Sequence, residues 1–202
     1  MAFTYFFRDM QTLEMIRDHV LPSLQSRRYM HIWDAGCAMG PEPYSIAIIL
    51  RENMGHMIFR NVTIHATDID ESNLFAKIVM EGIYPEEQVK RIPREIFFKY
   101  FARSEKSGHF IITSDIRKRI SFQKHDLLSL KPIRKDLGLI ICKNVLLHFK
   151  ETERINVIKM FHDALCEEGV FVTEQTQKMP LPVAELFTPI VSNAQLFRKV
   201  KR

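Results

Sequence analysis

Two acidic positions and two glycines lie within one short segment where a ligand could bind. Asp34 and Glu42 bracket Gly36 and Gly40, directly after a short apolar run. Glycines let the backbone approach a ligand closely, and the first turn of a following helix offers free N–H groups. The Gly-x-x-x-Gly spacing is neither the dinucleotide fingerprint nor a P-loop. Because Glu42 would repel a pyrophosphate, the segment indicates either a site for an ammonium group or only a tight strand-to-helix turn.

Two aspartates follow the second apolar run of the chain. The sequence there is Ala66-Thr67-Asp68-Ile69-Asp70. An acidic side chain at the end of a strand can accept hydrogen bonds from both hydroxyls of a ribose. Aspartate is also a common N-cap of a following helix. Since two aspartates are present, one can serve each purpose.

An asparagine and a histidine follow the apolar run 137–142. They are Asn144 and His148, in the segment Lys143-Asn144-Val145-Leu146-Leu147-His148. In open α/β sheets, ligands bind in the crevice at the carboxyl ends of the strands, so both side chains could reach one. From chemistry alone, His148 is as compatible with a structural role as with a catalytic one.

The pattern of apolar residues predicts alternating strands and helices around these positions. We expect strands over 31–35, 62–66, 137–142 and 169–174, and helices over 11–25, 43–53, 72–80 and 152–165. A last, antiparallel edge strand is expected over 193–200. This order is typical of an α/β fold with a doubly wound, mostly parallel sheet, formed here by one domain over residues 1–202.

Between the second and third expected strands the alternation is interrupted by a basic segment. Residues 86–101 have a helical pattern that breaks at Pro93, and the runs 109–113 and 119–123 favour strands. We therefore expect a small β-rich insertion over residues 100–123. From Gln88 to Arg119 there are nine basic and three acidic residues. Such a patch either steers the protein toward a polyanion, whether nucleic acid, membrane or acidic protein, or is only solvated surface.

The remaining composition excludes several classes of protein. The 202 residues include three widely spaced cysteines without a CxxC pair, which argues against a disulfide framework or a zinc site and for a reducing compartment. The first ten residues lack the cationic start and apolar run of a secretory signal. No stretch approaches the roughly 20 apolar residues that span a bilayer. We expect a cytoplasmic protein without a metal site and without membrane insertion.

Six motifs recur in the order found in a known family. The motifs are Thr4-Tyr5-Phe6-Phe7-Arg8-Asp9, Ile32-Trp33-Asp34-Ala35-Gly36-Cys37, Glu42-Pro43-Tyr44-Ser45-Ile46-Ala47, Ala66-Thr67-Asp68-Ile69-Asp70, Gly82-Ile83-Tyr84 and Cys142-Lys143-Asn144-Val145. With them the chain closely resembles the CheR-type chemotaxis methyltransferases, which use S-adenosylmethionine to esterify receptor glutamates and form S-adenosylhomocysteine. The resemblance runs from Thr4 to about Val172 and implies a Rossmann-like class I methyltransferase fold.

The resemblance assigns expected roles to individual residues. Arg8 matches an arginine near the sulfonium and the target carboxylate, where its planar fork of donors would orient the carboxylate. Glu42 matches an acid at the methionine portion of the cofactor, and Asp68 an acid at its ribose. Asp126 and Leu127 lie where the family has an Asn-Leu pair near the adenine. Asn144 matches an asparagine beside the cofactor, and Gly36 and Gly40 complete the expected cofactor turn.

Departures from the family pattern bear on the methyl acceptor. Ala38, Met39 and Pro41 remove a hydroxyl and an acid near the cofactor, Lys143 replaces an arginine, and His148 replaces a tyrosine. His148 has two alternative roles. As a neutral ring it would replace the tyrosine hydroxyl as a hydrogen-bond partner, and as a base it would suit an amine or hydroxyl acceptor.

The family also has a helical domain before its first motif, so we expect that domain to be absent here or supplied by a separate chain. The expected partner is an acidic protein such as a chemoreceptor helix, not nucleic acid. The alternative is a non-catalytic module that retains cofactor or partner binding.

Overall fold

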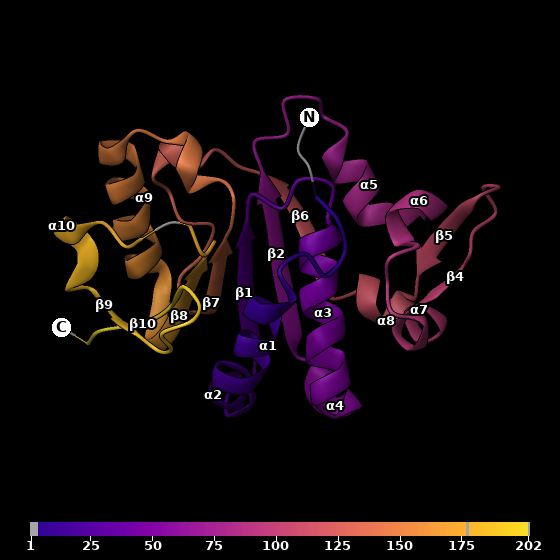
Figure 1. The fold of residues 1–202 in the computed structure, drawn as a ribbon, viewed down its shortest axis with the longest axis horizontal. Coiled ribbons are helices and arrows are strands. Elements are labelled where there is room, and N and C mark those ends of the chain that lie inside the picture. The colour runs from indigo at the N-terminus through magenta and orange to yellow at the C-terminus, as the bar shows by residue number, and fades with distance from the viewer. Residues whose placement is uncertain (1–3, 177, 202) are drawn as a thin grey trace.

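The computed structural model describes residues 4–176 and 178–201, and a seven-stranded sheet lies at its centre (Figure 1). Its strand order is β6-β2-β1-β7-β8-β10-β9. The neighbours from β6 to β8 pair in parallel, whereas β10 is antiparallel to β8 and β9. The predicted doubly wound, mostly parallel sheet is therefore confirmed. Its strands are β1 (Met30–Ala35), β2 (Val62–Asp68), β6 (Ile120–Lys124), β7 (Leu137–Cys142), β8 (Leu165–Thr173), β9 (Phe187–Pro189) and β10 (Leu196–Lys199).

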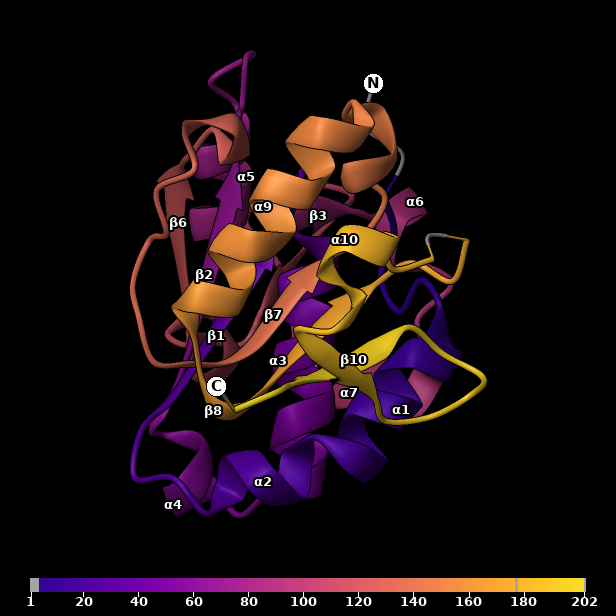
Figure 2. The same ribbon diagram turned by 90° about the vertical axis from the view of Figure 1, so that its left-hand side faces the viewer.

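Helices cover both faces of this sheet because its central strands are apolar on both sides. Along β1, Ile32 belongs to one hydrophobic core and Trp33 to the other. Figure 2 shows α9 (Glu151–Ala164) across one face, with α3 (Pro41–Asn53) behind it. Every residue of β7 is buried, as expected for a parallel strand covered on both faces. The other helices associated with the large sheet are α1 (Met10–His19), α2 (Leu21–Gln25), α4 (His56–Phe59), α5 (Phe75–Glu81), α8 (Ser114–Arg117), α10 (Leu181–Ala184) and the short 3-10 turns η1 (Leu127–Ser129) and η2 (Leu146–His148).

Local chemistry moves several boundaries from their predicted places. The helix expected over 11–25 is two helices, because Pro22 lies in the first turn of α2 and cannot donate a hydrogen bond to α1. The helix α3 begins at Pro41, two residues early, after Gly40 in a left-handed conformation. Conversely, α5 begins at Phe75 because the side chain of Asp70 holds the preceding residues in a turn.

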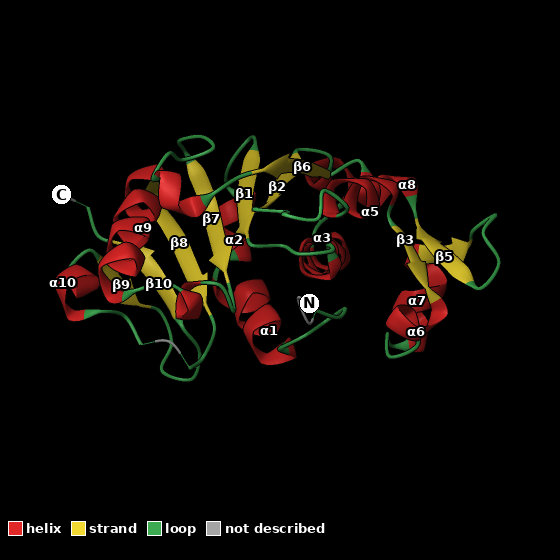
Figure 3. Cartoon of the chain, turned by 90° about the horizontal axis from the view of Figure 1, so that it is seen from above, coloured by secondary structure: helices red, strands yellow, loops and turns green. Residues whose placement is uncertain are grey.

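A second, antiparallel sheet stands apart from the first, to the right in Figures 1 and 3. It comprises β3 (Ile83–Pro85), β5 (His109–Ile112) and β4 (Phe101–Arg103) in that order, with α6 (Glu86–Val89) and α7 (Arg94–Tyr100). We call residues 83–112 the small module. Its boundaries differ from the expected insertion at 100–123, because the run 119–123 forms β6 and pairs with β2 in the large sheet. A short apolar run predicts a strand but does not show which sheet it joins.

The carboxyl-terminal part of the sheet also differs from expectation. The run expected as an edge strand over 193–200 forms β10, which lies between β8 and the three-residue strand β9. The true edge is β9, and its Pro189 fits that position because proline cannot donate within a sheet. The three cysteines are buried and unpaired. Across the residues that the structure describes, no helix is both long and apolar enough to span a membrane.

Candidate functional site

A cavity of about 580 Å³ opens at the carboxyl ends of β1, β2 and β7. This is the place where open parallel sheets bind ligands, and the volume suits a nucleoside-sized molecule. The cavity brings together residues from distant parts of the chain. Of the site residues predicted from sequence, its lining includes Arg8, Gly36, Glu42, Asp68, Asp126, Leu127, Asn144 and His148.

The two predicted glycines have different surroundings. Gly36 lines the cavity with a φ of 100°, and a Cβ there would come within 2.2 Å of the Val145 side chain. Gly40 has a φ of 96° and is not part of the described cavity lining. A Cβ on Gly40 would lie 2.8 Å from the Tyr84 hydroxyl, on the side of the small module. Gly40 therefore serves the turn before α3 and its packing, while Gly36 faces the ligand space.

The two aspartates after β2 divide the roles that the sequence left open. Asp70 is buried and accepts hydrogen bonds from the amides of Leu74, Phe75 and Ala76 at the start of α5. Burial alone would raise the pKa of Asp70, but these amide donors and the Ser72 hydroxyl outweigh it and lower that pKa. Asp68 instead borders the cavity, where its Oδ2 accepts from the Ala38 amide at 2.9 Å. Asp68 is thus the aspartate that can contact a ligand.

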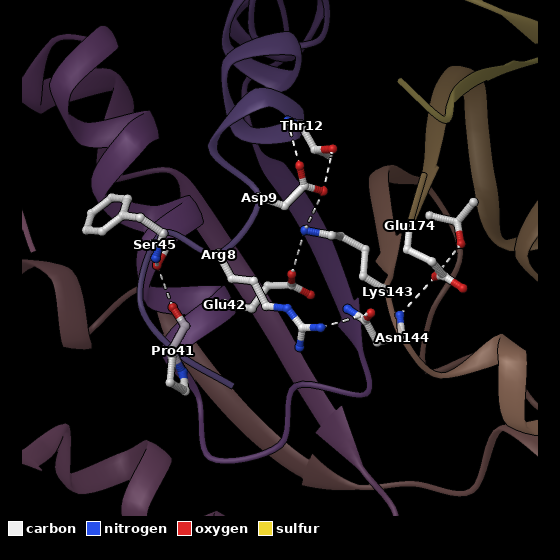
Figure 4. A network of polar contacts seen from close by, with 11 residues as sticks. Arg8, Asp9, Thr12, Pro41, Glu42, Ser45, Lys143, Asn144 and Glu174 are labelled. Atoms are coloured by element: carbon white, nitrogen blue, oxygen red, sulfur yellow. Dashed lines mark hydrogen bonds and ion pairs between the residues drawn. The ribbon is translucent and has the colours of Figure 1, made fainter. Parts of the chain in front are cut away.

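Arg8 reaches the cavity from the segment before α1. Its Nη2 donates to Asn144 Oδ1 at 3.2 Å, as Figure 4 shows. The segment is fastened to α3, because the amide of Phe7 donates to Ser45 Oγ at 2.8 Å. Asn144 has a φ of 58°, and its amide donates to the buried Glu174 at 2.9 Å. A left-handed asparagine fixed in this way is typical of functional sites, where local strain is balanced by the surrounding contacts.

A buried lysine beside Asn144 pairs with two acids, Glu42 of the cavity lining and Asp9 before α1. Lys143 Nζ lies 3.2 Å from Glu42 Oε2 and 3.3 Å from Asp9 Oδ2 (Figure 4). Burial lowers the pKa of Lys143, but the charges of Glu42 and Asp9 outweigh it and raise that pKa, so the amine stays protonated. Sequence reasoning recorded Lys143 only as a departure from the family pattern and missed Asp9. The signal for both was a charged residue beside a predicted site residue.

Asp34, at the end of β1, was part of the segment singled out in the sequence but was given no role of its own. It is fully buried, and neither carboxyl oxygen has a hydrogen-bond partner among the described residues. Burial raises the pKa of Asp34 well above its usual range, and the negative charge of Glu42 raises it further. The surroundings of Asp34 therefore disfavour its charged form. The available signal was an acidic residue at the end of an otherwise apolar strand.

The remaining predicted residues lie around the mouth of the cavity. The side chain of Asp126 accepts from the amide of Leu128 at 2.9 Å and so begins the turn η1, which places Leu127 in the wall. His148 ends η2 and is exposed at the rim. The apolar side chains of Ile69 and Leu147 complete the rim. The cavity therefore has acidic groups inside and apolar groups at its mouth.

Comparison with known proteins agrees with this geometry. The family described as "CheR methyltransferase, SAM binding domain" matches residues 2–195. A chemotaxis protein methyltransferase of Borreliella burgdorferi is 35% identical over 174 residues, which cover 82% of this chain and 60% of that protein. Chemotaxis protein methyltransferase 2 of Vibrio cholerae is 30% identical over 181 residues, which cover 87% of this chain and 62% of that protein. The chain thus spans about 60% of the length of these relatives.

Solved structures support the fold independently. The rRNA methyltransferase AviRa from Streptomyces viridochromogenes superposes with a TM-score of 0.58 at 12% identity, over 98% of this chain and 86% of that one. A methyltransferase from Geobacter sulfurreducens gives a TM-score of 0.54 at 10% identity, over 96% of this chain and 81% of that one. At these identities the likeness concerns the fold alone. The family match over nearly the whole chain shows that this protein belongs to the CheR methyltransferases and contains their S-adenosylmethionine-binding domain.

Proposed function

We propose that this chain transfers a methyl group from S-adenosylmethionine to a glutamate carboxylate of an acidic protein, such as a chemoreceptor. The observation that carries the proposal is the contact of Arg8 with Asn144 at the rim of an acidic cavity. A guanidinium presents a planar fork of donors that matches a carboxylate. The names of the chemotaxis relatives point to the same chemistry.

The donor set of the cavity fits this cofactor. Glu42 carries a carboxylate that can accept from the ammonium group of the methionine portion, and Asp68 can accept from ribose hydroxyls. The apolar rim formed by Ile69, Leu127 and Leu147 suits the flat adenine. These residues together would hold a ligand that carries an ammonium, a ribose and an aromatic ring.

The reaction depends on how the protein orients the reactants and does not require a proton transfer. When bound, S-adenosylmethionine supplies a methyl group on a positively charged sulfur. A glutamate carboxylate is already ionised at neutral pH, so no general base is required. Arg8 would hold the carboxylate in line, so that the new O–C bond forms as the S–C bond breaks. Opposite charges cancel in this step, which a water-poor cavity favours.

A tritium-transfer assay tests the proposal. The purified chain is incubated with [methyl-³H]S-adenosylmethionine and a Glu-rich helical peptide, or with cell extract. We expect label that mild alkali releases as methanol, because carboxyl methyl esters hydrolyse there. Arg8→Lys, which keeps the charge without the planar fork, serves as the matched control and should label more slowly.

Other outcomes select the alternatives. Alkali-stable label would indicate an amine acceptor, for which the exposed His148 at the rim could serve as the base. In that case His148→Gln should abolish the label, whereas for a carboxylate acceptor it should have little effect. Binding of S-adenosylhomocysteine without transfer to any acceptor would instead indicate a binding module. Isothermal titration with S-adenosylhomocysteine separates this result from a protein that does not bind the cofactor at all.

A further inference from the structure

Lys143 is a buried cation that joins three parts of the molecule. Its side chain is 2% exposed, and its two acidic partners are only 24% (Asp9) and 15% (Glu42) exposed. Asp9 belongs to the segment before α1, Glu42 to the first turn of α3, and Lys143 follows β7. A charge buried to this degree is costly unless it is paired on more than one side. The three groups therefore form one interacting unit rather than a pair of surface contacts.

Two neighbouring residues before α1 contact two neighbouring residues after β7. Lys143 pairs with Asp9, while its neighbour Asn144 accepts from Arg8, the neighbour of Asp9. The segment that carries Arg8 has unusual backbone angles, with φ of 57° at Phe7 and 59° at Asp9. Non-glycine residues hold such angles only where surrounding contacts enforce them. The ion pair of Asp9 with Lys143 is one of these contacts, and it lies next to the arginine.

We infer that Lys143 is a positioning residue, which holds Arg8 toward the cavity through Asp9 and fixes Glu42 for the cofactor. This inference rests on the proposed function, since it assigns Arg8 to the acceptor and Glu42 to the cofactor. The competing interpretation is that the buried ion pairs only stabilise the fold. The two interpretations differ in what happens at each acid when its contact with Lys143 is lost.

The two ion pairs of Lys143, with Asp9 and with Glu42, can be tested separately by substitution. Asp9→Asn removes the charge that pairs with Lys143 but can still accept from the amide of Thr12 and cap α1, because asparagine is as good an N-cap as aspartate. Lys143→Met removes both ion pairs with little change of shape. Lys143→Arg keeps the charge and is the conservative variant. Lys201→Met, which breaks the exposed pair of Lys201 with Glu167, is a matched control away from the cavity and the small module.

The value of kcat reports on the contact of Lys143 with Asp9, and the Kd for the cofactor product reports on its contact with Glu42. For Asp9→Asn we expect kcat to fall about tenfold or more through loss of orientation, with the Kd for S-adenosylhomocysteine within about twofold of the original. For Lys143→Met we expect both a lower kcat and a weaker Kd. Lys143→Arg should recover most of both, and Lys201→Met should change neither. If Asp9→Asn and Lys143→Met are folded and have unchanged kcat and Kd, the inference is wrong.

Hydrogen exchange gives a readout that needs no methyl transfer. The amide of Phe7 donates to Ser45 and that of Leu13 to Asp9, so peptides over residues 4–13 report on the Arg8 segment. Asp9→Asn and Lys143→Met should exchange faster there, while β7 peptides stay unchanged in Asp9→Asn.

Unchanged exchange over residues 4–13 in a folded variant overturns the inference. If Lys143→Met does not fold, Asp9→Asn and Lys143→Arg decide the outcome. If neither the original protein nor any variant transfers methyl groups, the proposed function fails. The exchange and titration results then still test whether Lys143 positions the Arg8 segment and Glu42.

Discussion

The charges of the cavity and those of the small module are arranged in opposite ways. In the cavity, Lys143 is almost fully buried and lies between Asp9 and Glu42. In the small module, basic side chains stand exposed on a three-stranded sheet and its helices, among them Arg91, Arg94, Arg103 and Lys106. Charges in a water-poor site act through their fixed position, whereas exposed charges are screened within about 8 Å at physiological salt. The cavity should therefore govern turnover, and the small module the encounter with an acidic partner.

The small module nevertheless packs against the segment that carries Arg8. The ring of Phe6 packs edge-on against Tyr84 at 4.9 Å and Phe101 at 5.4 Å, both of the small module. The Tyr84 hydroxyl donates to the carbonyl of Met39, in the turn before α3. Since Phe6 lies two residues before Arg8, the small module helps to seat the segment that carries the arginine. The contrast between the regions thus concerns their charges and not their packing.

Removal of the Arg8 side chain should have the largest effect. For Arg8→Ala we expect kcat/KM to fall about 100-fold or more, because loss of one well-placed charge-assisted contact to a reacting group commonly costs about 3 kcal/mol. The tritium-transfer assay measures this change. The Kd for S-adenosylhomocysteine should change much less. A variant with near-original kcat/KM would show that the acceptor is held elsewhere in the cavity.

A substitution at Asp68 should have the next largest effect, and it should appear in cofactor affinity. For Asp68→Asn we expect S-adenosylhomocysteine to bind about tenfold more weakly, because a charged acceptor of hydroxyl hydrogen bonds becomes a neutral one. Isothermal titration measures the Kd. Asp70→Ala is the matched control: it removes the cap of α5, so it should lower stability by about 1 kcal/mol and leave the Kd nearly unchanged. Equal losses of affinity in both variants would contradict the assignment.

Charge reversal in the small module should have a smaller effect that depends on salt. With Arg91, Arg94 and Arg103 changed to Glu, we expect KM for an acidic acceptor to rise about threefold to tenfold at low ionic strength, while kcat stays constant. The difference should shrink as salt is added. The matched control reverses Arg198 and Lys201, which lie at the other end of the large sheet near Glu167 and Glu168. An unchanged KM at low salt would separate the module from acceptor binding.

The sequence predicted much of the cavity because its residues follow strands at the same edge of the sheet. Asp68, Asn144 and the Gly36 turn are each local features of a strand end, and the parallel sheet brings those ends together. What the sequence did not predict depends on contacts between distant segments. The pairing of Lys143 with Asp9, and the choice of β6 for the large sheet, involve residues more than 50 positions apart. Neither spacing nor periodicity carries that information.

A further prediction concerns stability rather than activity and involves Asp34, the fully buried acid at the end of β1. Because burial and Glu42 raise its pKa in the folded protein, Asp34 keeps a proton at a pH where the unfolded chain has lost it. Its contribution to stability is therefore full below the ordinary aspartate pKa, about 3.9, and decreases as the pH rises toward the folded-state value.

Asp34→Asn, which cannot ionise, should remove this component. In urea unfolding from pH 5 to pH 8, the original protein should lose stability relative to Asp34→Asn, by at most about 1.4 kcal/mol for each pH unit. Parallel curves for the two proteins would mean that Asp34 is ionised when folded.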